Sequence, residues 1–200
     1  MATLIFLGTI ITLIALVIKA IIQIIQHKSS VPAFGMIGIV ILAYSLVWGI
    51  FYLKNNMEIV PFGTNIRFDD WAATITQFDE PKTLGDERQP TYPAGQFIVL
   101  HIKMSNFARG IAQKPSEPRV HIIDGDGHSW AYSVEGQLAL EELTGKQIPV
   151  DQKLELHQSL ETQLVFDVPK DAKDLKAIIE EGPFITKLLI NEHKEVFLLQ

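Results

Sequence analysis

The stretch QFIVLHIKMSN (96–106) carries a large apolar side chain at every second position over most of its length. These side chains are Ile98, Leu100, Ile102 and Met104. The positions between them hold Val99, His101 and Lys103. Successive side chains of an extended chain point to opposite faces, so a period of two is typical of a strand with one buried face. The stretch therefore predicts a strand that packs against a second layer.

Other strand-forming segments lie on both sides of this stretch, separated by turn-forming residues. WAATITQF (71–78) places Trp71, Ala73 and Ile75 on one face and Phe78 on the other. Residues 137–143 are predicted to form a short helix. The remaining predicted strands are RVHIID (119–124), SWAYSV (129–134), LETQLVFDVP (160–169), DLKAIIEEG (174–182), FITKLLI (184–190) and EVFLL (195–199). Short strands without a βαβ alternation indicate an all-β sandwich.

Two apolar segments precede the strands. LIFLGTIITLIALVI (4–18) and PAFGMIGIVILAYSLVWGIFYL (32–53) contain no charged residue. A helix of roughly 20 apolar residues crosses ~30 Å of hydrocarbon. The connection QHKSSVP (26–32) is short, so residues 1–54 are predicted to form an α-helical transmembrane hairpin, with helices at about 3–25 and 32–53.

Two other interpretations of these segments fit the sequence less well than the hairpin. A cleaved signal peptide would need a charged start and a small-x-small cleavage site, and the first segment lacks both. Core helices of a soluble protein would need a polar stripe, whereas both segments are apolar all round.

Small and aromatic residues of the second segment predict how the hairpin packs and where it ends. Small side chains let helices approach closely, and here they are Gly35, Gly38, Ser45 and Gly49. Aromatic residues near the end of a span favour the membrane interface, and here they are Trp48, Phe51 and Tyr52, just before Lys54.

The charge of the chain changes at the same boundary. The first acidic residue is Glu58, which follows Lys19, Lys28 and Lys54. The remaining 14 of the 17 basic residues accompany 23 acidic ones, which gives this part a formal charge of −9. An acidic domain has no electrostatic reason to bind nucleic acid. We therefore expect residues 55–66 to be a linker and residues 67–200 to be an acidic sandwich domain.

Charge near the membrane does not fix the orientation of the hairpin. Lys19 and Lys28 lie on the side of the connecting loop, and Lys54 and Arg67 lie on the other, so the positive-inside rule is balanced. The chain also lacks cysteine, which excludes disulfides, thiolate zinc sites and cysteine nucleophiles.

DGDGHSWAYSVE (124–135) has the partial spacing of a calcium loop. Asp124, Asp126 and Glu135 stand at positions one, three and twelve and are the candidate metal ligands. His128 at position five is a poor calcium ligand, and Ser129 replaces the glycine of position six. Asp-Gly pairs also supply the backbone angles that a two-residue hairpin requires. A turn between two strands is the favoured interpretation.

Other candidate sites carry weaker signals. His101, His121 and His128 have no zinc-ligand spacing, and LTGKQ (143–147) lacks the first glycine and the final Ser/Thr of a phosphate loop. No GxSxG elbow is present. The acidic pairs 141–142 and 180–181 are expected to be solvated, and Trp130 and Tyr132 are expected to pack in the core.

The segments Gly95–Asn106, DGDGHSW (124–130) and LVFDVP (164–169) resemble a bacterial family of domains of unknown function. The family is similar to the immunoprotective extracellular proteins of mycobacteria, and the resemblance spans about residues 71–200. It implies an immunoglobulin-like sandwich. Its members are usually exported and tethered, which implies an extracytoplasmic domain. It supplies no catalytic residues.

We therefore expect a multi-pass protein of the cell membrane that carries an extracytoplasmic, non-catalytic binding or scaffolding domain of unknown ligand. No cofactor is expected. The expected partners are the lipid bilayer and another membrane or envelope protein. An accessory subunit of a larger membrane complex is the alternative, and an uncharacterised enzyme is the weaker one.

Overall fold

The computed structural model describes residues 2–54, 57–68, 70–182 and 194–199. The chain separates into two compact units. The first contains the two N-terminal helices, and the second contains residues 57–182 together with 195–200.

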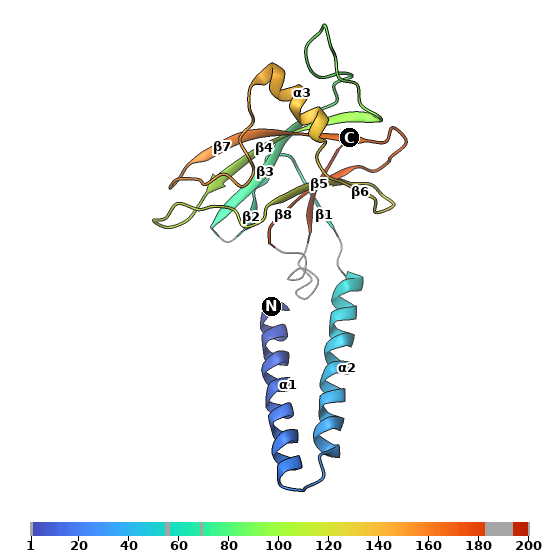
Figure 1. The fold of residues 1–200 in the computed structure, drawn as a ribbon, viewed down its shortest axis with the longest axis vertical. Coiled ribbons are helices and arrows are strands. Elements are labelled where there is room, and N and C mark those ends of the chain that lie inside the picture. Colours follow the sequence, from blue (N-terminus) through green and yellow to red (C-terminus); the bar gives the residue numbers. More distant parts are fainter. Residues whose placement is uncertain (1, 55–56, 69, 183–193, 200) are drawn as a thin grey trace. The chain divides into compact units, whose positions relative to one another are not determined.

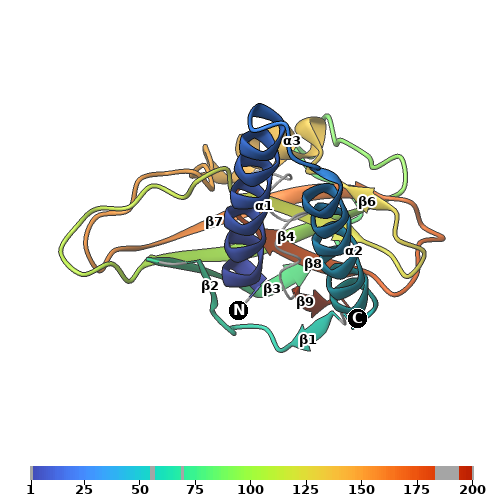
Figure 2. The ribbon, with the colours of Figure 1, turned by 90° about the horizontal axis from the view of Figure 1, so that it is seen from below.

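The first unit is a pair of helices, α1 (Ala2–Ile25) and α2 (Val31–Lys54), which lie side by side in opposite directions (Figures 1 and 2). Partly or fully buried positions recur every three or four residues. They are Thr9, Leu13, Leu16, Ala20 and Gln23 in α1 and Ala33, Ile37, Val40, Tyr44 and then Gly49 in α2. A stripe with this spacing is the geometry of a two-helix seam. The helices therefore meet along one narrow face, although both are apolar all round.

Alanines, and not glycines, make the tightest contact of this pair. Ala20 is 3 % exposed and Ala33 is fully buried. A Cβ placed on Gly35, Gly38 or Gly49 would meet no other atom within 4 Å. Gly35 and Gly38 are exposed, so the prediction that these two glycines bring the helices together is wrong, whereas Gly49 is half-buried.

Among the described residues, one helical segment, Leu7–Ile25, is long and apolar enough to cross a membrane, with a mean hydropathy of 2.3. Val31–Val47 is a shorter apolar helical segment of α2. The predicted aromatic anchor lies outside the part whose side chains the structure describes, because Trp48, Phe51 and Tyr52 belong to α2 by backbone alone.

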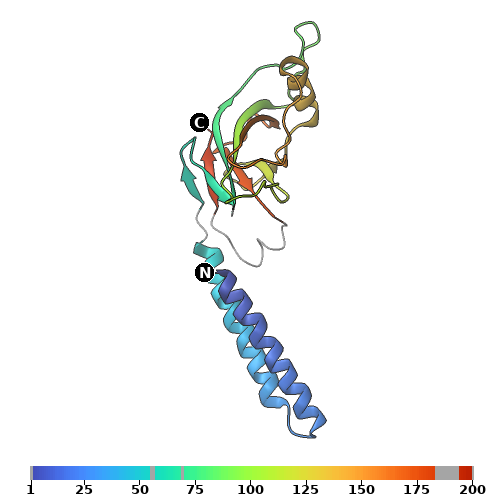
Figure 3. The same ribbon diagram turned by 90° about the vertical axis from the view of Figure 1, so that its left-hand side faces the viewer.

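The second unit is a sandwich of two sheets (Figure 3). Sheet A has the order β1-β9-β8-β5-β6, and sheet B has the order β2-β3-β4-β7. The strands of sheet A are β1 (Glu58–Val60), β5 (Arg119–Ile123), β6 (Ser129–Trp130), β8 (Lys176–Glu180) and β9 (Glu195–Leu198). The strands of sheet B are β2 (Ile66–Phe68), β3 (Trp71–Asp79), β4 (Gln96–Asn106) and β7 (Ser159–Val168). All described pairs are antiparallel except β1 with β9.

The alternating stretch that predicted the fold forms β4, at the centre of sheet B. Ile98, Leu100, Ile102 and Met104 all face the core between the sheets. Phe166 of β7 and Phe197 of β9 fill the same core from the two sheets. The all-β sandwich is therefore confirmed.

A helix covers part of the outer face of sheet B. The helix α3 (Val134–Thr144) places Ala139 and Leu140 against Phe97 and Val99 of β4 and Val165 of β7. Val99 was predicted on the solvent face and is buried for this reason. The predicted short helix at 137–143 is confirmed and is longer than expected.

A β-bulge changes the faces of β3. Ile75 pairs with Ile102, but Gln77 pairs with His101, so Thr76 has no partner in the ladder. An extra residue reverses the alternation beyond it. Phe78, predicted on the outer face, therefore packs against the core, while Gln77 and Asp79 turn outward.

Three other boundaries differ from the predictions. Residues 55–66, predicted as a linker, contain β1 and the first residue of β2, so the sandwich begins earlier than residue 67. SWAYSV forms only the two-residue strand β6, because the chain leaves the sheet to begin α3 with Ser133 as its N-cap. The predicted strand FITKLLI lies outside the described residues.

The motif LVFDVP closes one end of sheet B. The carboxylate of Asp167 accepts hydrogen bonds from the N–H groups of Ala94 (2.7 Å) and Gly95 (2.9 Å). A Cβ on Gly95 would lie 2.1 Å from the carbonyl oxygen of Val168. The glycine is therefore required by the close approach of the two backbones.

Candidate functional site

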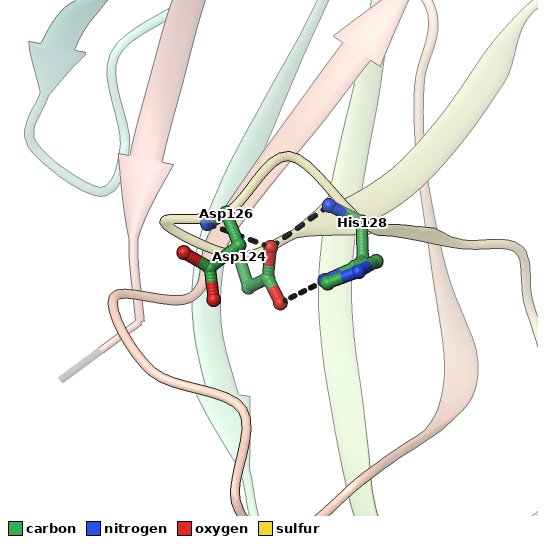
Figure 4. Close-up of side chains that lie close together, drawn as sticks. All are labelled: Asp124, Asp126 and His128. Carbon is green, nitrogen blue, oxygen red and sulfur yellow. Dashed lines mark hydrogen bonds and ion pairs between the residues drawn. The ribbon is translucent and has the colours of Figure 1, made fainter.

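The loop between β5 and β6 is organised around one buried carboxylate. Asp124 is 8 % exposed, and its Oδ1 accepts hydrogen bonds from the backbone N–H groups of Asp126 (3.0 Å) and His128 (2.8 Å). Its Oδ2 lies 2.9 Å from Nδ1 of His128 (Figure 4). The Asp124 N–H also donates to the His128 carbonyl at 3.1 Å. Side chain and backbone therefore close the same loop.

The loop is longer than the predicted two-residue turn. Ile123 pairs with Ser129, so residues 124–128 form the connection. Of its two glycines only Gly127 has a left-handed backbone, with φ +88°. The segment is a turn between two strands, as predicted. It is closed by hydrogen bonds to the side chain of Asp124, whereas a shorter hairpin would need two residues with left-handed backbone angles.

The pair of Asp124 and His128 shifts the pKa of both groups. Burial alone would raise the pKa of Asp124, but the hydrogen bonds from His128, its positive charge and the N–H of Asp126 together hold that pKa below its usual value. The hydrogen bond to Asp124 and the charge of that carboxylate raise the pKa of His128, and Asp126 adds to the effect. The charged pair is therefore favoured at mildly acidic pH.

The same residues are the only described group with metal-ligand spacing. Asp124, Asp126 and His128 each offer one ligand atom, and these atoms lie within 4.8 Å of one another. Glu135 is not among them, because it lies in the first turn of α3. Calcium takes about six to eight oxygen ligands, whereas both oxygens of Asp124 already accept hydrogen bonds. The geometry favours a structural turn over a calcium site.

A second polar cluster lies on the outer face of sheet B. Nε2 of His101 lies 2.7 Å from Oδ2 of Asp79, and Nδ1 lies 3.1 Å from the side-chain amide of Gln163. The amide of Gln77 is 3.4 Å from the ring. Gln77 and Asp79 reach this face only because of the bulge at Thr76. Both ring nitrogens have partners, so the imidazole is not positioned as a free base.

The three histidines considered for zinc are not brought together. His101 lies in sheet B, and His121 and His128 belong to the β5–β6 side of sheet A. Within the residues that the structure describes, no group of three metal ligands includes His101 or His121. LTGKQ ends α3, with Gly145 as its C-cap, whereas a phosphate loop precedes a helix.

Glu181 stabilises the fold through a contact that the sequence did not predict. It was expected to be solvated, but one of its oxygens accepts hydrogen bonds from Nε1 of Trp71 and from the N–H of Ser116, both at 2.8 Å. This contact joins β3 of sheet B to the chain that follows β8 of sheet A. No spacing rule predicts it, because the partners are far apart in sequence.

Trp130 and Tyr132, which were both expected in the core, lie in different surroundings. Trp130 packs against the core as predicted and also lines a groove with Asp126 and Lys173. Tyr132 lies beyond the end of β6 and is 51 % exposed.

Residues 60–188 match the model of a family described as a domain of unknown function, DUF4352. The chain belongs to the DUF4352 family. The predicted resemblance to a bacterial family of this kind is confirmed. No curated protein matches the chain significantly.

Solved structures resemble the DUF4352 sandwich. A conserved hypothetical protein of Bacillus anthracis is 17 % identical, with a TM-score of 0.50 over 66 % of this chain and 91 % of that one. A secreted protein of Mycobacterium tuberculosis, MPT63, is 10 % identical, with a TM-score of 0.46 over 72 % and 98 %. An uncharacterised β-sandwich protein of Clostridium difficile is 16 % identical, with a TM-score of 0.47 over 73 % and 96 %. The first of these shows that the fold of the DUF4352 chain occurs in a crystal structure.

Proposed function

We propose that this DUF4352 chain is a membrane-anchored, non-catalytic binding or scaffolding module. The hairpin α1–α2 spans the cytoplasmic membrane of a bacterium, and the sandwich is displayed on the outer side. The observation that carries the proposal is the apolar surface that the two helices leave uncovered.

Large aliphatic side chains point away from the helix pair. Ile25 is 71 % exposed and Ile39 is 66 % exposed, and most other described leucines and isoleucines of α1 and α2 are exposed as well. Burying one such side chain is worth about 1.5–3 kcal/mol. A continuous surface of this kind is unfavourable in water and favourable in hydrocarbon, which supports a membrane location.

The polar clusters of the sandwich support a non-catalytic role. In the residues that the structure describes, the imidazoles of His101 and His128 are each hydrogen-bonded to a carboxylate, and neither bonds to a serine hydroxyl. Asp124 and Glu181 accept backbone and indole N–H groups. Groups whose hydrogen bonds stabilise the fold in this way do not form a nucleophile–base pair. The loops and strand edges supply binding surfaces instead.

The resemblance supports an extracytoplasmic orientation. Family members are usually exported and tethered, and basic residues near the membrane do not oppose that orientation. Both ends of the hairpin lie on the same side of the membrane when α1 and α2 each cross it once. The connecting loop around Lys28 then lies in the cytoplasm.

Cysteine labelling tests both the anchor and the orientation, because the chain contains no cysteine. Glu87→Cys places a thiol on an exposed loop of the sandwich, and Ser29→Cys places one in the connecting loop of the hairpin. A membrane-impermeant maleimide should label the first variant in intact cells and the second only after permeabilisation. The reverse pattern would disprove the orientation. Release of the chain by alkaline carbonate would disprove the anchor.

Purification in mild detergent distinguishes a free-standing module from an accessory subunit. A monomer that remains stable alone fits the binding module. A stable heterologous partner that stays bound through gel filtration would favour the accessory subunit.

A further inference from the structure

The strand β7 forms one edge of sheet B and is long for an edge. It covers Ser159–Val168 and pairs with β4 along its whole length on one side. The N–H and C=O groups of alternate residues point away from β4. A long open edge is a template for pairing with another strand.

Groups from α3 and the loop after it occupy this edge. The side chain of Gln137 accepts a hydrogen bond from the N–H of Val165 (3.0 Å) and donates to the C=O of Gln163 (3.0 Å). The side chain of Gln147 accepts from the N–H of Gln163 (3.1 Å). The N–H of Ser133 donates to the C=O of Val165 at 2.7 Å. Both edge-facing groups of Gln163 and of Val165 therefore have the partners that a neighbouring strand would supply.

Close packing holds these groups in place. Gly136 lies against the sheet, where a Cβ would come within 2.6 Å of Val165 Cγ1 and 3.0 Å of the Phe97 ring. The next turn of α3 buries Ala139 and Leu140 against the same outer face. The glutamine side chains are thus fixed by the position of the helix.

We propose that α3 and the loop after it, through Gln137 and Gln147, prevent β7 from pairing with β7 of a second copy of this chain. This inference depends on neither the membrane anchor nor the binding role, so it goes beyond the proposed function. The occupant of an uncovered edge would be a second copy because β7 is complementary to itself.

The complementarity appears in an antiparallel register centred on Gln163. Glu161 then lies opposite Val165, and Ser159 lies opposite Asp167, so no like charges face each other. Gln163 lies opposite Gln163. The residues whose N–H and C=O groups point outward face one another in this register, as an antiparallel ladder requires.

The test uses the full chain in detergent micelles. The double variant Gln137→Ala/Gln147→Ala removes three of the four strand-like hydrogen bonds, and it keeps the backbone bond of Ser133 and the apolar contacts of α3. We expect its protein mass by light scattering to rise with concentration from 22.4 kDa towards twice that value. The matched control Gln89→Ala/Gln152→Ala changes two exposed glutamines away from β7 and should remain monomeric.

Cross-linking tests the register. Gln163→Cys, introduced into both double variants, should give a disulfide-linked dimer under mild oxidation in the uncovered variant and none in the control. A monomer at every concentration, without cross-linking, would overturn the proposal.

Hydrogen exchange on the unaltered chain decides the matter if the double variant does not fold. The amides of Gln163 and Val165 should exchange as slowly as those of Leu164 and Phe166, which lie within the β4–β7 ladder. Exchange of the two edge amides about tenfold or more faster would show that α3 does not cover them, and would overturn the proposal.

Discussion

The helix pair and the sandwich bury opposite kinds of residue. Among the side chains of α1 and α2 that the structure describes, the fully buried ones are alanines, and large isoleucines are exposed. In the sandwich, Phe97, Phe166 and Phe197 are buried, and the exposed surface is acidic overall. Both parts are rich in apolar residues, so hydrophobicity alone does not distinguish them. The difference shows that the sandwich is stabilised by its own core, whereas the helices present their apolar surface to their surroundings.

The largest expected effect contrasts two leucines. Leu100→Ala removes a fully buried side chain from the centre of β4 and should lower the free energy of unfolding of the sandwich by about 2–5 kcal/mol. Leu46→Ala removes a side chain that is 61 % exposed on α2 and should change it by less than about 0.5 kcal/mol. Denaturant unfolding in micelles, followed by tryptophan fluorescence, measures both. Equal losses would remove the contrast between the two parts.

A second contrast concerns polar side chains. The amide of Asn106 donates to the carbonyls of Ile111, Leu154 and Glu155, and its Oδ1 accepts from the N–H of Ala108. Asn106→Ala leaves buried backbone groups without partners and should cost about 2–3 kcal/mol.

Thr12 is the matched position in the hairpin. Its hydroxyl donates only to the Gly8 carbonyl of its own helix, so Thr12→Ala should change stability by less than about 0.5 kcal/mol. A loss for Asn106→Ala as small as that for Thr12→Ala would show that the loops around Asn106 are held by other contacts.

Glycines provide the third contrast. Gly95→Ala places a Cβ against the backbone of Val168 and should cost about 1–3 kcal/mol. Gly49→Ala in α2 has open space around the new Cβ and should be neutral or slightly stabilising, because alanine is the better helix former. Thermal melts of the two variants give the comparison, and a neutral Gly95→Ala would mean that the two backbones can separate.

The smallest effect is the pH dependence of the β5–β6 loop. The pKa of His128 is raised in the folded chain, so its contribution to stability is present below its unfolded value, about 6.5, and is lost as pH rises through the raised pKa. The pKa of Asp124 is lowered, so its contribution is lost only as pH falls through that lowered value. The melting temperature should therefore fall slightly between mildly acidic and mildly alkaline pH. His128→Gln should flatten this dependence, and an unchanged slope in the variant would assign it to other groups.

The core of the fold was predictable because apolar residues at every second position identify the buried face of a strand. The alternation of β4 and the strand LETQLVFDVP identified two neighbouring strands of sheet B, β4 and β7, and the two apolar segments identified both helices. Val99 and Phe78 were misplaced for reasons that a local pattern does not contain. A helix from elsewhere in the chain covers Val99, and one unpaired residue reverses Phe78.

The candidate site was predicted less completely. The sequence placed Asp124 and Asp126 in a turn, but not the role of Asp124 as the centre of its hydrogen bonds. The contact of Glu181 with Trp71 joins residues 110 positions apart, and the coverage of β7 by Gln137 and Gln147 depends on where α3 packs. Such contacts follow from the tertiary arrangement and leave no signal in local spacing.

The single extra residue at Thr76 has a consequence for comparing related chains. A homologue that lacks the residue equivalent to Thr76 would have a regular strand here, with Trp71, Ala73, Ile75 and Phe78 still inside and Gln77 and Asp79 still outside. An alignment that places the gap a few positions away would then match core residues with solvent residues between that gap and Thr76. The position of the gap in such an alignment can therefore be checked, because the residue aligned with Phe78 should face the core.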